Sequence, residues 1–206
     1  METLIKLFGN AAKVKTIKLF VFNSGVAYDA TQIADRTKEP VSKVRKEALQ
    51  LEKLDLIRRK SFQKTVTRKA RGKKQGAKVK TNGWILNDTF EHLAPLTEFL
   101  VGLSKFAPKD IARKLSRSGT IKLIIVSGTF INSPESRLDL LVVGDNIKKG
   151  LLEQSIKIIE SEMGMELRYA FFDTADFKYR LGLYDKLLRD VLDFPHEKVV
   201  NKLMIP

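Results

Sequence analysis

The chain has 206 residues, 43% of them hydrophobic, with a formal net charge of +14 and no cysteine, and its two histidines, His92 and His196, are far apart in sequence. This composition excludes disulfides and thiolate metal sites, and it argues against a histidine-rich metal centre. No apolar run approaches the roughly 20 residues of a membrane span and residues 1–10 show no signal-peptide pattern, so we expect a soluble cytoplasmic protein of one large or two small domains.

The positive charge is concentrated in the first half of the chain. Residues 1–90 contain 21 Lys and Arg against 8 Asp and Glu, a net charge of +13, whereas residues 91–206 contain 17 against 16. A polyanion responds to the field of a local patch and not to an average over the chain. We therefore expect a nucleic-acid-binding surface in the first half; the alternative is a solvated face that only aids solubility.

Three short helices are predicted in this half, at residues 10–23, 29–38 and 40–54. The third has an apolar stripe at spacings of three and four, which predicts a face turned to a core: Val41, Val44, Ala48, Leu51 and Leu54. A recognition helix reaches bases and phosphates from the first turns of its other face. The residues at those positions are Ser42, Lys43, Arg45 and Lys46.

A basic hairpin is predicted next, with one strand starting at Leu56 and a second at residues 79–86. The segment from Arg58 to Lys80 contains no acid. Its eleven basic residues, each a candidate for phosphate or minor-groove contact, are Arg58, Arg59, Lys60, Lys64, Arg68, Lys69, Arg71, Lys73, Lys74, Lys78 and Lys80. We expect Trp84 and Phe62 to pack on the helices, since aromatic side chains are generally buried.

The rest of the chain alternates helices with apolar strands. Helices are predicted at 89–103, 108–116, 147–163, 174–182, 185–192 and 195–203, and strands at 121–126, 138–143 and 165–172. Apolar strands separated by a helix imply a sheet covered by helices. The pattern predicts an α+β or α/β protein of two domains, with the helix at 89–103 as their connector.

Two parts of the chain resemble known families. Leu7-Phe8-Gly9-Asn10-Ala11-Ala12-Lys13-Val14-Lys15 and Gly83-Trp84-Ile85-Leu86-Asn87 resemble winged helix-turn-helix transcription regulators. The turn Ser127-Gly128-Thr129, followed by the strand Arg137-Leu138-Asp139-Leu140-Leu141-Val142-Val143-Gly144, resembles the minimal nucleotidyltransferase domain. The resemblances imply a winged-helix domain at 1–88, a connector at 89–105 and a transferase-like domain with a mixed sheet at 106–206.

The second resemblance also implies that catalysis has been lost. That family holds nucleotide phosphates on a Gly-Ser turn and metal ions on three carboxylates, and here Thr129 stands at the serine position. Arg137 and Arg168 stand at the first and third carboxylate positions, and only Asp139 is retained. Because nucleotidyl transfer depends on metal ions that neutralise developing charge, we expect no enzyme activity, no metal site and no cofactor.

Two hypotheses remain for these residues. Asp139 could be a structural partner of Arg137 or Arg168, since buried charges are usually paired. Alternatively, the two arginines could bind a phosphorylated effector beside the turn at 127–129, because guanidinium groups suit phosphate.

The sequence as a whole predicts a transcription regulator that binds double-stranded DNA. Its second domain would serve regulation or dimerisation, since a homodimer would suit two half-sites. The alternatives are an active nucleotidyltransferase targeted by a winged helix and an RNA-binding module.

Overall fold

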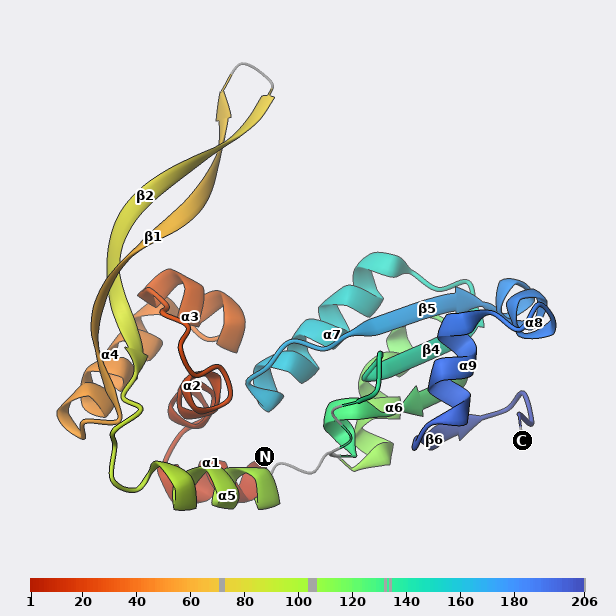
Figure 1. The fold of residues 1–206 in the computed structure, drawn as a ribbon, viewed down its shortest axis with the longest axis horizontal. Coiled ribbons are helices and arrows are strands. Elements are labelled where there is room, and N and C mark those ends of the chain that lie inside the picture. Colours follow the sequence, from red (N-terminus) through yellow and green to blue (C-terminus); the bar gives the residue numbers. More distant parts are fainter. Residues whose placement is uncertain (71–72, 104–106, 132, 134, 206) are drawn as a thin grey trace. The chain divides into compact units, whose positions relative to one another are not determined.

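The computed structural model describes residues 1–70, 73–103, 107–131, 133 and 135–205, and within residues 66–76 it describes no side chains. Contacts divide the chain into two compact units. The first unit is Met1–Ser104 with Ser161–Met165, and the second is Lys105–Glu160 with Glu166–Pro206. Helices and small sheets occur together along the chain (Figure 1), so the predicted α+β class is confirmed.

The first unit contains five helices and a two-stranded sheet among its described residues. In chain order they are α1 (Glu2–Phe8), α2 (Ala11–Val21), α3 (Ala30–Thr37), α4 (Val41–Lys53), β1 (Ile57–Ala70), β2 (Lys73–Leu86) and α5 (Leu93–Leu103). Helices α2, α3 and α4 match the three predicted. Helix α1 was not predicted, and α5 begins later than the predicted residue 89. Pro95 lies in the first turn of α5, where a missing N–H costs no hydrogen bond.

Polar side chains fix where α2 and α3 begin. The side chain of Asn10 accepts a hydrogen bond from the N–H of Lys13. Asp29 caps α3 in the same way, and the side chain of Gln32 accepts in return from the N–H of Asp29, which completes a capping box. Each cap satisfies backbone groups that a helix end would otherwise leave unpaired.

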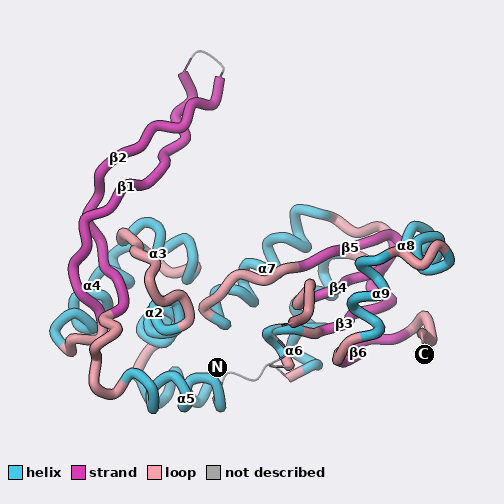
Figure 2. Tube along the Cα trace, viewed as in Figure 1, coloured by secondary structure: helices cyan, strands magenta, loops and turns pink. Residues whose placement is uncertain are grey.

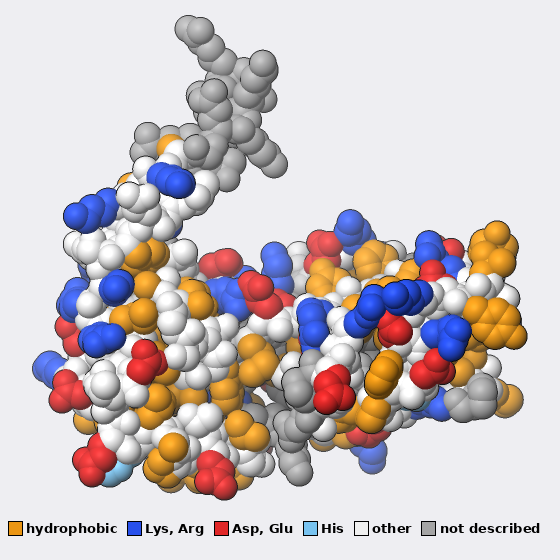
Figure 3. Space-filling view, in the orientation of Figure 1, with side chains coloured by type: hydrophobic (Ala, Val, Ile, Leu, Met, Phe, Trp, Pro, Cys, Tyr) orange, Lys and Arg blue, Asp and Glu red, His pale blue; other side chains and the backbone are white. Residues whose placement is uncertain are grey.

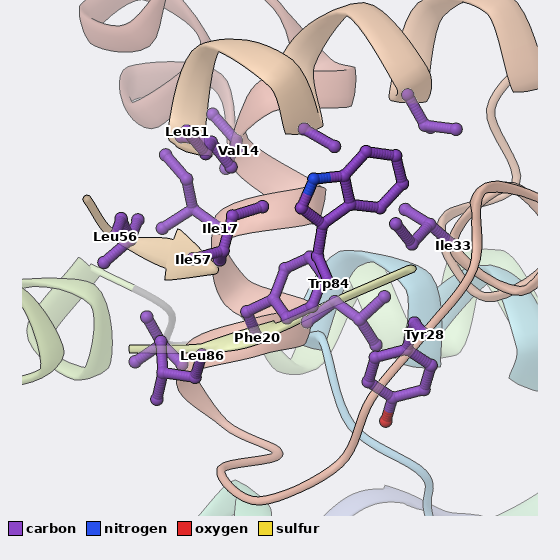
Figure 4. Packing of buried hydrophobic residues seen from close by; sticks show 14 of the residues in the cluster. Val14, Ile17, Phe20, Tyr28, Ile33, Leu51, Leu56, Ile57, Trp84 and Leu86 are labelled. Atoms are coloured by element: carbon purple, nitrogen blue, oxygen red, sulfur yellow. The ribbon is translucent and has the colours of Figure 1, made fainter. Parts of the chain in front are cut away.

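The hydrophobic core of the first unit joins α2, α3 and α4 to the base of the sheet (Figure 4). Trp84 on β2 is buried among them, as predicted for this residue. Its backbone exchanges two hydrogen bonds of 2.9 Å with Tyr28, in the loop before α3, which ties that loop to β2. The predicted stripe on α4 is correct only in its centre, because Val41 and Leu54 remain 45% and 64% exposed.

Strands β1 and β2 form a long antiparallel hairpin. Its register runs from Ile57 opposite Leu86 at the base to Ala70 opposite Lys73 at the far end. Only the base lies against the helices of the unit, and the rest of the ribbon extends away from them (Figure 1, Figure 2). Most of the hairpin side chains that the structure describes are therefore accessible to a partner on both faces of the ribbon.

The second unit is built on a four-stranded sheet. Its elements are α6 (Pro108–Leu115), the 3-10 turn η1 (Ser116–Ser118), β3 (Thr120–Val126), the 3-10 turn η2 (Gly128–Phe130), β4 (Leu140–Asp145), α7 (Lys149–Met163), β5 (Tyr169–Asp173), α8 (Thr174–Gly182), α9 (Lys186–Asp193) and β6 (Glu197–Asn201). The strand order is β5-β4-β3-β6. Strands β4 and β5 are parallel and joined through α7, whereas the other two pairs are antiparallel.

The helix predicted at 195–203 is wrong. Residues Glu197–Asn201 form strand β6, which pairs antiparallel with β3. Val199 and Val200 are β-branched and favour an extended chain, and β3 supplies the backbone partners that a helix would have found within itself. The strand predicted at 165–172 is also shorter than expected, because α7 ends at Met163, Gly164 follows it in a left-handed conformation, and β5 begins only at Tyr169.

Candidate nucleic-acid interface

The first two turns of α4 carry three cations on their outer face, and these have no acidic partners among the described residues. Val44, Ala48 and Leu51 are buried and fix the rotation of the helix. That rotation exposes Ser42, Lys43, Arg45 and Lys46, the four residues predicted from the sequence. A shallow depression follows the same face, lined by Val41, Ser42, Arg45, Lys46, Leu49, Gln50 and Lys53. The face combines hydrogen-bonding groups, methyl groups and positive charge.

The acid of α4 nearest this surface is turned inward. Glu47 is 6% exposed, and its carboxylate accepts a hydrogen bond of 3.1 Å from Nδ2 of Asn10 and lies 3.5 Å from Nζ of Lys13. Glu47 was not among the predicted site residues, although its position between Val44 and Leu51 places it on the buried stripe. Its burial keeps the outer face of α4 cationic.

Four of the predicted hairpin cations are exposed and make no ion pair within the described chain: Arg58, Lys60, Lys78 and Lys80. The register places Arg58 and Lys60 on one face of the ribbon, and Lys78 and Lys80 on the other, because side chains alternate along a strand. Figure 3 shows lysine and arginine side chains gathered over the hairpin. Positive charge therefore surrounds the described part of the ribbon.

Arg59 instead belongs to a clamp at the base of the hairpin. Its Nε lies 2.8 Å from the carboxylate of Glu52 on α4, and its guanidinium lies 4.9 Å from the ring centroid of Trp84. Nε1 of Trp84 donates to the same carboxylate at 2.8 Å. Hydrogen bonds from Arg59 and then Trp84 hold the pKa of Glu52 below its usual value. Glu52 was not predicted from the sequence, because no local pattern connects it to Trp84, 32 residues later.

Lys64 is also committed to a contact within the unit. Its ammonium forms an ion pair with Asp29, the residue that caps α3, and only 26% of its side chain is exposed. Burial would raise the pKa of Asp29, but hydrogen bonds from Lys64, Thr31 and the N–H of Gln32 outweigh it and lower that pKa. Arg71 and the side chains of Arg68, Lys69, Lys73 and Lys74 lie outside the described residues.

In the second unit, Asp139 is a fully engaged buried acid. Its Oδ1 accepts from the N–H of Thr129 at 2.8 Å and from Nη2 of Arg168 at 3.1 Å. Its Oδ2 accepts from the N–H of Arg168 at 2.8 Å and from Nε of Arg168 at 3.1 Å. Burial alone would raise the pKa of Asp139, but these hydrogen bonds outweigh it and the pKa is lowered.

The turn beside Asp139 is shaped around this ion pair. Gly128 has a left-handed backbone with φ of 54°, and a Cβ placed there would lie 2.2 Å from Oδ1 of Asp139. Ser127 is buried, and its hydroxyl donates to the carbonyl of Leu138 at 2.6 Å. The structure thus brings together Ser127, Gly128, Thr129, Asp139 and Arg168, as predicted, in an arrangement in which the groups bind one another.

Arg137 has a different partner. Its Nε lies 2.7 Å from Oδ2 of Asp190 on α9. Each of the two arginines at the expected carboxylate positions therefore faces a carboxylate of its own. The hypothesis that Asp139 is a structural partner of Arg168 fits this geometry, whereas an anion site formed by Arg137 and Arg168 would have only the guanidinium donors that the two ion pairs leave over.

The described residues contain no group of three or more His, Cys, Asp or Glu side chains placed to hold a metal ion. In the same part of the chain, no helix combines the length and apolar character needed to cross a lipid bilayer.

Comparison with known proteins gave no match. No protein-family model, no curated protein and no solved structure matches the chain.

Proposed function

We propose that this chain is a transcription regulator that binds duplex DNA, with α2–α4 and the β1–β2 hairpin acting as a winged helix-turn-helix. The observation that carries the proposal is a set of seven exposed cations, on two adjoining elements, that no acid neutralises within the described chain. They are Lys43, Arg45, Lys46, Arg58, Lys60, Lys78 and Lys80. DNA binding releases the counterions held by phosphates, and unpaired cations are the groups that drive this release.

The two elements have different roles in this proposal. An α-helix fits the major groove of B-form DNA, so the exposed face of α4 contacts base edges through Ser42 and Arg45. The hairpin follows the phosphate backbone with cations on both faces. Phosphate contacts supply affinity and orientation, whereas base contacts supply sequence preference. The proposal therefore separates residues that set affinity from residues that set specificity.

The first experiment selects fragmented genomic DNA on the purified full-length protein at physiological salt and sequences what is retained. One enriched motif is the expected result. Uniform retention would contradict a specific regulator, and it would leave a non-specific nucleic-acid binder.

A matched pair of variants then tests the hairpin. Replacement of Arg58, Lys60, Lys78 and Lys80 by Ala should weaken binding to every sequence and lower the log–log salt slope by about 3 to 4, since each phosphate contact contributes about 0.9. The control replaces four exposed lysines of the second unit by Ala: Lys148, Lys157, Lys178 and Lys186. The control and the hairpin variant have the same net charge. An equal loss of DNA affinity in both would therefore show a general charge effect and contradict the proposal.

For the second unit we infer a structural or regulatory role without nucleotidyl transfer. The hydrogen bonds described for Asp139 all come from Thr129 and Arg168, which leaves this carboxylate saturated where the resemblance expects a metal ligand. Incorporation of labelled nucleotide by the wild-type protein that is lost in Asp139→Ala would overturn this inference. Because each arginine of the site faces a carboxylate, we propose no effector site there.

A further inference from the structure

Leu49 is an apolar side chain in the middle of the cationic face of α4. Successive residues of an α-helix are rotated by about 100°, so Leu49 points away from the core that Val44 and Leu51 enter. It is 40% exposed, and it lines the shallow depression of that face together with Arg45 and Lys46. The methyl groups of this leucine are therefore available to a partner.

Cations surround Leu49 on this face. Arg45 and Lys46 precede it by four and three residues, and Lys53 follows it by four, so all three lie beside it on the helix surface. All three are exposed, and Arg45 and Lys46 have no acidic partner in the described chain. A surface of this composition fits a partner that presents anionic groups around an apolar one.

The major groove of duplex DNA is such a partner. Phosphates run along both of its rims, and the C5-methyl group of thymine projects into it. Among the four bases, thymine alone presents an apolar group on this edge. Because a leucine side chain has no hydrogen-bonding group, the favourable base contact that it can make there is with this methyl group.

We propose that Leu49 contacts the C5-methyl group of a thymine, so that the protein prefers a T·A pair at one position of its binding site. This inference rests on the proposed function, because it requires α4 to lie in the major groove. It adds a base contact without a hydrogen bond to those of Ser42 and Arg45. Phosphate contacts by Lys46 and Lys53 would hold the leucine against the bases.

A second leucine supplies a matched control. Leu54 follows the last turn of α4 and is 64% exposed, but it is not among the residues that line the depression. Leu54→Ala removes the same atoms as Leu49→Ala and leaves every cation in place. A difference between the two variants therefore reports the position of the leucine and not the loss of apolar surface.

Removal of single methyl groups from the DNA tests the proposal. Each thymine of the duplex that the full-length protein enriches is replaced in turn by deoxyuridine, which forms the same base pair but lacks the C5-methyl group. One replacement should weaken binding by the wild type about fourfold, the effect of withdrawing one methyl group from an apolar contact.

The variants then assign this methyl effect to a residue. Leu49→Ala should bind the thymine duplex more weakly and should show no further loss with deoxyuridine at that position, because the two changes remove the same contact. Leu49→Met keeps an apolar side chain of similar volume and should retain the methyl effect. Leu54→Ala should bind as the wild type does and retain the fourfold loss. All three substitutions are at exposed positions and should leave the circular dichroism spectrum unchanged.

The outcomes separate this contact from DNA binding itself. The contact is excluded, with DNA binding left standing, by an enriched motif without A·T pairs or by methyl groups that can all be removed without loss. A methyl effect that persists in Leu49→Ala, or that is lost equally in Leu54→Ala, also excludes it. The absence of any enriched motif would overturn both the contact and the proposed function.

Discussion

At the residue scale, the buried ion pair of the second unit depends on one carboxylate, Asp139, that accepts hydrogen bonds from Thr129 and Arg168. Asp139 connects the turn at Gly128 and Thr129 to the start of β5 through Arg168, so it joins two segments that are adjacent only in the folded chain. Gly128 makes this possible because a Cβ at that position would occupy the space of the carboxylate. The carboxylate and the turn are therefore parts of one local structure.

Asp139→Asn should destabilise the second unit by about 2 kcal/mol at pH 7, because the amide removes the charge and leaves one fewer acceptor for buried donors. Far-UV circular dichroism during denaturant unfolding measures the loss. Fluorescence of Trp84, the single tryptophan, reports the first unit and should be unchanged. The exposed Asp193→Ala serves as the control and should have little effect.

The same ion pair predicts a pH dependence. The pKa of Asp139 is lower in the folded protein than in the unfolded chain, where it is about 3.9. Its stabilising contribution is therefore complete above about pH 4 and is lost as the pH falls through the folded pKa. The difference in unfolding free energy between the wild type and Asp139→Asn should shrink in that acid range, and a constant difference down to acid unfolding would contradict this account.

At the element scale, the hairpin uses its cations in two ways. Arg59 and Lys64 pair with Glu52 and Asp29 and hold the base of the ribbon to α4 and α3. Arg58 and Lys60, on the same strand, are exposed and have no acidic partner in the described chain. The sequence pattern does not distinguish these four residues. In the folded chain, Arg59 and Lys64 form ion pairs that hold the hairpin, whereas Arg58 and Lys60 are exposed to a partner.

This separation predicts different effects for two double variants of β1. Arg58→Ala with Lys60→Ala should lower the salt slope of DNA binding by about 2 and leave unfolding unchanged. Arg59→Ala with Lys64→Ala should lower the unfolding free energy of the first unit by about 1 kcal/mol, with a smaller change in slope. Each double variant removes one Arg and one Lys. Salt titrations measure the slope of DNA binding, and Trp84 fluorescence during denaturant unfolding measures the stability of the first unit. Equal salt slopes in the two double variants would refute the distinction between paired and exposed cations.

At the scale of the whole molecule, the charge is segregated along the chain. Residues 1–90 carry a net charge of +13, and residues 91–206 carry +1. A basic surface attracts the phosphates of DNA and RNA alike. A preference for one of the two must therefore come from the shape of the double helix that the protein contacts. The major groove of B-form DNA admits a helix, whereas that of A-form RNA is too deep and narrow for one.

Duplex DNA should therefore displace a labelled DNA probe from the full-length protein at roughly tenfold lower concentration than structured RNA does, at the same salt. The reason is that α4 adds base contacts only on DNA. Arg45→Ala should reduce this preference, because the variant keeps the hairpin cations and loses a candidate base contact. Equal competition by RNA would favour the alternative of an RNA-binding module.

Much of the first unit follows from local sequence. Helices α2, α3 and α4 and the hairpin strands were predictable because their apolar spacings, caps and turn residues lie within a few positions of one another. The exposure of Lys43, Arg45 and Lys46 followed from the same stripe. Strand β6 was not predictable in this way, because its structure depends on pairing with β3, more than 70 residues earlier in the chain.

The sequence by itself determined the segregation of charge, the helices of the first unit and the basic hairpin, because these depend on composition and short-range spacing. Only the tertiary structure decided which cations are free, since Lys64 meets Asp29 across 35 positions. It also decided that Asp139 meets Arg168 across 29 positions and that β5 is left as a sheet edge. Contacts between residues so distant in sequence depend on chain topology and packing, and a local sequence pattern does not predict them.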